Sequence, residues 1–257
     1  MPSTQWDTSI THVEPNKVMV RGYPIDNLMG KLTFAQTIWL VTMGEIPDNQ
    51  LSRLLEGIFV SSIDHGASPP SCLAARTVAS TGAGLSASVA AGIMSINKHH
   101  GGAIEGCYLV LNSAIDIAKS ENLSYEDAAS RIIDEFKANK KFIPGFGHRL
   151  HTADPRTARL KELAKESGYS GDCLRMAEIF ERHFEKSGRS IPLNVDGALG
   201  AILGDLGVPH EMMNGFFMIA RLPGLLTHVH EETTTMKPMR KIHPTDFNYT
   251  GPEERKV

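Results

Sequence analysis

The chain of 257 residues has few cysteines, few aromatic residues and no large excess of one charge. Its three cysteines, Cys72, Cys107 and Cys173, are far apart and odd in number, so they predict neither a disulfide framework nor a zinc site. We therefore expect a reducing, cytoplasmic location. The formal net charge of -3 excludes a chain-wide basic field for nucleic acid.

Long apolar runs are also missing. No uninterrupted apolar segment reaches the length of about 20 residues that a membrane-spanning helix needs. Residues 1–14 are polar and acidic rather than basic and then apolar, so we expect neither a signal peptide nor a membrane partner. The hydrophobic share of 41% is nevertheless enough for a large core, in one domain or two closely packed ones.

Strand patterns are scarce, and residues 17–23 are the one candidate with alternating character. Helical spacing of apolar residues dominates instead, which predicts an all-α fold. Asp48 and Ser124 are suited to cap two of the helices, and Gly44 followed by Pro47 is a typical helix stop. Helices are expected over residues 32–43, 51–59, 104–117, 128–136, 156–166, 172–185 and 211–220.

Residues 80–96 are unusually rich in glycine, alanine and serine. Leu85, Val89 and Ile93 recur within this segment at four-residue spacing, which favours a helix over a flexible linker. Small side chains allow helices to approach closely. We therefore expect this helix at the centre of a bundle or at a contact between subunits.

The first motif with chemical potential is His99-His100-Gly101-Gly102, which precedes an expected helix. The positive end of a helix dipole disfavours imidazolium, so a histidine placed there is expected to be neutral. A neutral imidazole can donate a hydrogen bond to a carbonyl or enolate oxygen. The alternative interpretation is a helix cap beside exposed histidines.

The second motif is residues 142–149, in which Gly145 and Gly147 precede His148. Two glycines one residue apart allow the backbone to approach a ligand and turn its N–H groups toward it. Arg156 begins the next expected helix, and imidazole with guanidinium suits a substrate that carries carboxylates. The alternative is a purely structural loop.

The third motif is Asn194-Val195-Asp196-Gly197. Pro192 is suited to the start of a helix, which would place Asp196 near the first turn among apolar residues. A carboxylate in that setting can act as a general base. The alternative is an acidic residue that only complements the helix dipole.

Other polar residues have weaker claims. We interpret residues 64–66 as a polar turn and Arg76 as a solvated charge. His228-Val229-His230 raises the question of a metal, but no third ligand is evident, so we expect no metal site.

Taken together, the motifs resemble the citrate synthase superfamily, most of all its short citryl-CoA lyases and the citryl-CoA lyase module of ATP-citrate lyase. The resemblance implies an all-α, citrate-synthase-like fold, with a large helical domain (1–110 and 201–257) and an inserted smaller helical domain (111–200). It is carried, in order, by residues 21–24, 44–47, 64–66, 100–103, 144–149, 154–156, 194–196, 221 and 249–251.

The resemblance also implies roles for individual residues. His100, His148 and Asp196 match the family's catalytic histidines and aspartate. The positions that hold substrate carboxylates match His65, Arg156 and Arg221. Coenzyme A would bind along Ile143, Pro144, Gly145, Phe146 and Gly147, with Asn194 near its adenine and Lys186 and Arg189 near its phosphates.

Two departures from the synthase pattern bear on the reaction. The spacing from His148 to Arg156 is one residue shorter than in many citrate synthases, so the placement of Arg156 is open. The chain also lacks a long helical section between residues 44–47 and 64–65, as the short lyases do. We therefore expect a citryl-CoA lyase that releases acetyl-CoA and oxaloacetate.

Other functions stay open at this point. A condensing synthase could use the same residues, with acetyl-CoA or a related acyl-CoA and oxaloacetate or another 2-oxo acid. A non-catalytic subunit that binds coenzyme A or regulates a partner belongs to another class. The resemblance implies no bound cofactor, since the CoA thioester is the substrate. It also implies a homodimer or larger homo-oligomer and leaves open a separate citryl-CoA synthetase partner.

Overall fold

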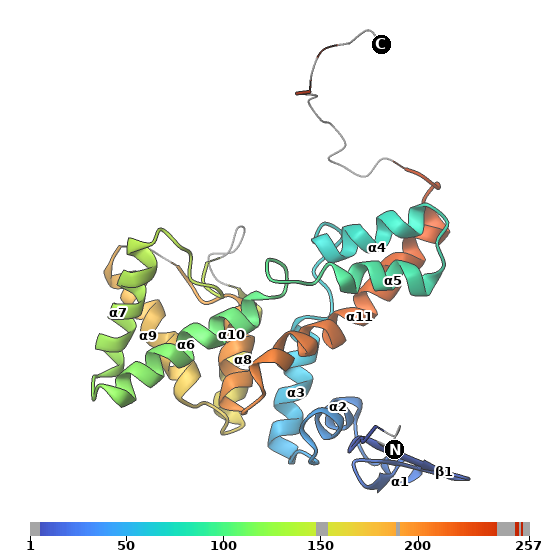
Figure 1. Ribbon diagram of the computed structural model, residues 1–257, viewed down its shortest axis with the longest axis horizontal. Helices are drawn as coiled ribbons and strands as arrows, with labels where there is room; N and C mark the ends of the chain where they lie inside the picture. The colour runs from blue at the N-terminus through green and yellow to red at the C-terminus, as the bar shows by residue number, and fades with distance from the viewer. Residues whose placement is uncertain (1–5, 148–153, 189–190, 241–249, 252, 254–257) are drawn as a thin grey trace, which may run out of the picture. The chain divides into compact units, whose positions relative to one another are not determined.

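The computed structural model describes residues 6–147, 154–188, 191–240, 250–251 and 253 (Figure 1). A small antiparallel sheet near the N-terminus contains β1 (Thr11–Glu14), β2 (Lys17–Val20) and β3 (Tyr23–Pro24), in the order β1-β2-β3. Thr11 pairs with Val20, and Val20 pairs with Tyr23. The candidate strand at residues 17–23 is therefore confirmed over residues 17–20, after which the chain turns and Tyr23 begins the next strand.

The rest of the described chain is mainly helical, as the sequence predicts. Thr33, Asp48 and Ser124 cap three helices through side-chain bonds to backbone N–H groups. The helices are α1 (Ile25–Leu28), α2 (Phe34–Met43), α3 (Asn49–Ser61), α4 (Pro70–Ser80), α5 (Leu85–Met94), α6 (Ala103–Ser120), α7 (Tyr125–Ala138), α8 (Pro155–Glu166), α9 (Asp172–Lys186), α10 (Val195–Asp205) and α11 (His210–Thr235). Among these described helices, none is both long and apolar enough to cross a bilayer.

The chain forms two compact units. Unit 1 contains Met1–Ile63 with Gly101–Ala220, and unit 2 contains Asp64–His100 with Arg221–Val257. The predicted division into a large domain at 1–110 and 201–257 and an inserted domain at 111–200 stays a prediction.

In unit 1, α6 packs against α7, α9 and α10, while α8 packs against α3 and α10 (Figure 1). Apolar side chains on the facing sides of these helices are fully buried, among them Leu111 of α6, Phe180 of α9 and Ile202 of α10. Their removal from water is the main force that holds these helices together.

In unit 2, α4, α5 and the C-terminal part of α11 enclose a small core (Figure 1). It consists of Cys72, Ala75, Ala79, Val89, Leu225 and Val229. The helices are in close contact, because a Cβ at Gly92 would lie 3.0 Å from the carbonyl oxygen of Ser71. The close approach expected of the small-residue segment is therefore present.

The predicted single helix over 80–96 is wrong in its first turn. α4 extends to Ser80, and the chain then turns at Gly82, whose φ of +90° suits glycine, before α5 begins at Leu85. The run of small residues thus spans the end of one helix, a turn and the next helix.

The predicted end of the last helix near residue 220 is also wrong, because α11 continues through Pro223 to Thr235. A proline inside a helix removes one backbone hydrogen bond and costs about 3 kcal/mol. Leu225 and Val229, one helical turn apart, are buried in the core of unit 2. Their tertiary packing offsets the cost of the proline.

Arg76 is not a solvated charge, contrary to the sequence interpretation. Its side chain is 6% exposed, and its Nε donates to Glu232 Oε2 at 2.6 Å. Glu232 is fully buried and also accepts from Arg240 Nε at 2.6 Å. A charge on α4 can be buried because α11 supplies its partner 156 residues later in the chain.

Candidate active site

His100 is the last residue of the first segment of unit 2, and Ser71, near the start of α4, holds its ring. The Oγ of Ser71 lies 2.8 Å from Nε2 of His100, and the backbone N–H of Ser71 donates to the same nitrogen at 3.3 Å. A backbone N–H can only donate, so we assign a lone pair to Nε2 and the ring proton to Nδ1. His100 therefore presents an Nδ1–H donor.

The pKa of His100 lies below its ordinary value of 6.5. Burial is the largest cause, and the nearby positive charges of Arg221 and His65 lower it further. The ring thus stays neutral at neutral pH. The sequence predicts the same neutral form through the dipole of the following helix, but burial and two cationic neighbours account for it here.

Arg221 and His65 belong to unit 2, as His100 does. Arg221 is 4% exposed in α11, and its charge acts on both His100 and the thiol of Cys72. His65 is exposed in the turn that precedes α4. The structure therefore places one predicted catalytic residue and two predicted carboxylate-binding residues in one neighbourhood of unit 2.

In unit 1, the glycine-rich loop is joined to the segment before α10. Gly147 N–H donates to the Pro192 carbonyl at 2.8 Å, and Asn194 N–H donates to the Gly145 carbonyl at 2.9 Å. Phe146 and Leu193 form an isolated antiparallel bridge. Pro192 is thus in an extended segment rather than at the helix start, which corrects that part of the prediction.

Gly145 is required by close packing. Its φ is +80°, and a Cβ there would lie 2.6 Å from Cys107 Sγ and 2.7 Å from Gly197 Cα. A Cβ at Gly197 would in turn collide with the carbonyl oxygen of Gly145. The loop is therefore pressed against the first turn of α10, and neither glycine tolerates a side chain.

Asp196 is the second residue of α10 and is half-buried. Its helix is capped by Asn194, whose Oδ1 accepts from Gly197 N–H at 3.0 Å while its Nδ2 donates to the Gly147 carbonyl at 2.8 Å. The charge of Asp196 also acts on Cys107, whose thiol pKa is raised mainly by burial. Asn194 thus fixes the loop relative to Asp196, and its predicted contact with adenine stays a prediction.

Arg156 is engaged within unit 1. Its Nη2 lies 2.7 Å from Asp154 Oδ2, its Nε donates to Asp154 Oδ1 at 3.1 Å, and its Nη1 donates to the Ser61 carbonyl at 3.3 Å. The guanidinium of Arg156 is thus paired with both carboxylate oxygens of Asp154, and this bidentate pair has a structural role. Binding of a substrate carboxylate by Arg156 stays a prediction.

A pocket of about 500 Å³ lies in unit 1 between the end of α7, the glycine-rich loop and the end of α9. Ile143 and Phe146 form part of its apolar wall, and Phe146 stacks on Phe180 with ring centroids 5.6 Å apart. Lys137, Lys140 and Lys141 also line it. The pocket therefore combines an apolar wall with three cations, which suits a ligand with a flat ring and anionic groups.

Two predicted residues, His148 and Arg189, lie outside the described residues. Lys186 is the exposed last residue of α9. His100 belongs to unit 2 and Asp196 to unit 1. The convergence of His100, His148 and Asp196 around one substrate thus stays a prediction.

Sequence reasoning missed Ser71 and the lysines that line the pocket. Ser71 is completely buried, yet it follows two prolines in a segment without any motif, 29 residues before His100. No local signal identifies it. The lysines at positions 140 and 141 directly precede the glycine-rich motif, so their position could have suggested a role beside it.

Comparison with known proteins agrees with these features. The family model "Citrate synthase, C-terminal domain" matches residues 42–245. The chain belongs to the citrate synthase family. The structure is similar to that of citryl-CoA lyase from Hydrogenobacter thermophilus, with 40% sequence identity, a TM-score of 0.87, and coverage of 98% of this chain and 97% of that chain.

The chain spans only part of the length of the curated relatives that it matches. The chain is 28% identical to the probable ATP-citrate synthase of Dictyostelium discoideum over 77% of its own length, but it spans 33% of that protein. It is 30% identical to the citrate synthase of Helicobacter pylori over 93% of its own length and spans 56% of that relative. The predicted superfamily and its citrate-synthase-like, mainly helical fold are confirmed, and the comparisons support an enzyme of this superfamily.

Proposed function

We propose that the chain is a citryl-CoA lyase, which cleaves citryl-CoA to acetyl-CoA and oxaloacetate. The observation that supports this most strongly is the similarity to the Hydrogenobacter thermophilus citryl-CoA lyase over nearly the full length of both chains. The direct test is to incubate the chain with citryl-CoA. The proposal expects oxaloacetate as the product and is rejected if citrate accumulates instead.

The proposed reaction begins at the tertiary hydroxyl of citryl-CoA. His148 removes the hydroxyl proton, the electron pair forms the new carbonyl of oxaloacetate, and the carbon–carbon bond breaks. The bond electrons pass to the acetyl-CoA enolate. The Nδ1–H of His100 donates to the thioester oxygen as negative charge develops there, which its neutral, Ser71-bound ring supports.

The enolate then takes up a proton. In this proposal Asp196, in its acid form, delivers that proton to the enol carbon, and in the reverse direction its carboxylate removes a methyl proton. Arg221, His65 and Arg156 hold the carboxylates of the oxaloacetate part and fix its orientation. All steps use imidazole and carboxyl groups of this chain.

The pocket in unit 1 is proposed to receive the nucleotide end of coenzyme A. Ile143 and Phe146 would contact the adenine, and the ammonium groups of Lys137, Lys140 and Lys141 would lie near its phosphates. Phe142, which is 96% exposed, also lines the pocket and offers a ring for stacking.

Replacement of both Lys140 and Lys141 by alanine is expected to raise the Kd for coenzyme A about tenfold, since charge-assisted bonds to phosphate are lost. Isothermal titration calorimetry at fixed salt measures this change. Lys31→Ala, an exposed lysine away from the pocket, is the matched control. If the double variant and the control bound coenzyme A with equal affinity, the proposal that its nucleotide end binds in this pocket would be rejected.

A condensing synthase is the second candidate, favoured by the similarity to the Helicobacter pylori citrate synthase. With acetyl-CoA and oxaloacetate, such an enzyme releases free coenzyme A, whereas a lyase releases little or none. A non-catalytic subunit would bind coenzyme A and turn over neither citryl-CoA nor acetyl-CoA.

The proposal includes a homodimer or larger homo-oligomer in the cytoplasm. The small residues of α5 and its exposed Leu85 and Met94, 54% and 76% exposed, suit a contact between subunits. A separate citryl-CoA synthetase would supply the substrate.

A further inference from the structure

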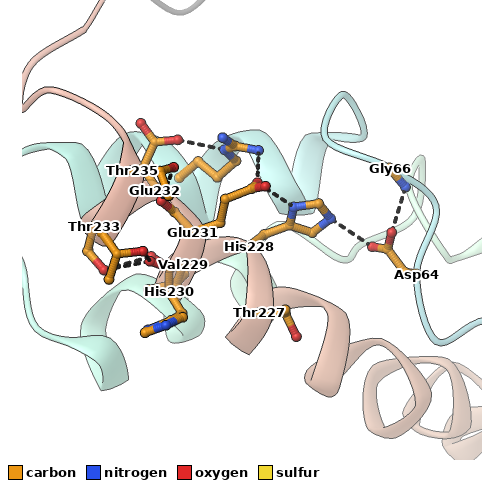
Figure 2. A network of polar contacts seen from close by, with 12 residues as sticks. Asp64, Gly66, Thr227, His228, Val229, His230, Glu231, Glu232, Thr233 and Thr235 are labelled. Carbon is orange, nitrogen blue, oxygen red and sulfur yellow. Dashed lines mark hydrogen bonds and ion pairs between the residues drawn. The ribbon is translucent and has the colours of Figure 1, made fainter.

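The turn that carries His65 is held by its neighbour Asp64. Asp64 Oδ2 accepts from the N–H of Gly66 at 3.0 Å, which closes the turn around His65. The other oxygen, Oδ1, lies 3.0 Å from Nε2 of His228 on α11. One carboxylate therefore joins the turn to the part of α11 that belongs to the same unit, as Figure 2 shows.

The direction of the contact between Asp64 and His228 follows from charge. Burial alone would raise the pKa of Asp64, but the Gly66 N–H and the His228 ring outweigh it, and the pKa lies below the ordinary value of 3.8. The carboxylate is therefore ionised at neutral pH and can only accept. Nε2 of His228 must carry the proton and donate it.

A second carboxylate, that of Glu231, lies on the other side of His228. Nδ1 of His228 lies 3.8 Å from Oε2 of Glu231, and that oxygen accepts from Arg76 Nη1 at 3.2 Å. Arg76 Nε also donates to Oε2 of the fully buried Glu232 at 2.6 Å. The side chain of His228 is 17% exposed, so the ring has little freedom between its two carboxylates.

The same helix carries another histidine in a different setting. His230 is exposed, and its side chain takes part in none of the contacts drawn in Figure 2. The two histidines therefore differ in role although they lie two residues apart. Of the two histidines, His228 is the one that contacts the turn carrying His65, through Asp64.

We propose that His228 is a positioning residue for substrate binding. Its ring binds Asp64, and Asp64 in turn closes the turn that carries His65. That turn places His65 near His100, since the charges of His65 and Arg221 both act on the His100 ring. The inference rests on the proposed function, in which His65 binds a carboxylate of the substrate. It assigns to His228 an effect on substrate affinity that passes through His65.

The test measures KM and kcat for citryl-CoA cleavage. His228→Ala is expected to raise KM about tenfold with a smaller change in kcat, because a charge-assisted bond that orients His65 is lost. His228→Gln retains an N–H donor and is expected to recover most of the affinity. His230→Ala is the matched control and is expected to behave as wild type.

A double-mutant cycle separates positioning from general destabilisation. In a His65→Ala background, His228→Ala is expected to have almost no further effect on KM, because the residue through which it acts is absent. Equal tenfold effects with and without His65 would overturn the proposal, as would a wild-type KM in His228→Ala. Asp64→Asn, which keeps an acceptor for Gly66, provides a second route to the same comparison if His228→Ala does not fold.

Failure of the positioning proposal is distinct from failure of the proposed function. If the wild-type chain leaves citryl-CoA unchanged or releases citrate, the lyase proposal fails and the positioning proposal fails with it. If the wild type is active and the His228 and His230 variants match it, only the positioning proposal fails.

Discussion

Asp196→Ala is expected to lower kcat for citryl-CoA cleavage by about a thousandfold or more, since general acid–base groups contribute roughly 10² to 10⁴ in rate. The carboxyl lies in the first turn of α10, which the glycine-rich loop and Asn194 hold in place through backbone contacts. Removal of the side chain leaves those contacts intact. The Kd for coenzyme A should therefore stay within about threefold of wild type.

Single-turnover kinetics and calorimetry on the same preparations measure both quantities. Asp196→Asn keeps the size of the side chain but not the acid, and is expected to be as inactive as Asp196→Ala. Asp116→Asn, an exposed aspartate on α6, is the matched control. Turnover at the wild-type rate in Asp196→Asn would reject the assignment of the acid.

His100→Ala is expected to lower kcat by about 10² to 10³, the usual effect of removing one donor to a developing oxyanion. The effect should fall on kcat more than on KM, because the hydrogen bond strengthens only as charge develops on the thioester oxygen. His99→Ala removes an exposed neighbouring imidazole and is expected to leave kcat unchanged.

The state of His100 gives this prediction a second readout. Burial, Arg221 and His65 lower the pKa of His100, so its neutral form persists as pH falls below 6.5. In ¹H–¹⁵N NMR spectra, the wild-type ring is expected to show the neutral Nδ1–H tautomer at pH 6.5, and Ser71→Ala is expected to weaken that preference. A protonated His100 at pH 6.5 would contradict the proposed donor.

The features that sequence predicts correctly are local ones. Asp48 and Ser124 cap their helices as expected, and Gly44 ends α2 with a φ of +92°. Each of these signals involves residues within one helical turn of each other, and the chemistry of the cap does not depend on distant partners.

The features that sequence misses depend on distant parts of the chain. Arg76 is expected from the sequence to be solvated because Glu232 is 156 residues away. The last helix is expected to end at residue 220, because the core of unit 2 that stabilises the rest of α11 is built from three helices. Ser71 lies 29 residues from His100, with which it pairs. Tertiary contacts decide these cases, and no local pattern reports them.

The site shows the same division. The glycine-rich loop could be predicted because Gly145 is needed for its backbone conformation. The first turn of α10 could be predicted because it carries the acidic residue Asp196. The hydrogen bonds that join the loop to Pro192 and Asn194 are formed between segments about 50 residues apart, and the sequence reading instead placed Pro192 at the start of the helix.

The central claim is that this chain breaks the carbon–carbon bond of citryl-CoA. The most direct measurement incubates the purified chain with citryl-CoA and quantifies oxaloacetate, acetyl-CoA, citrate and free coenzyme A at several times. Cleavage predicts oxaloacetate and acetyl-CoA in equal amounts, with Asp196→Ala inactive in parallel. Formation of citrate and free coenzyme A, or recovery of unchanged citryl-CoA, would contradict the account.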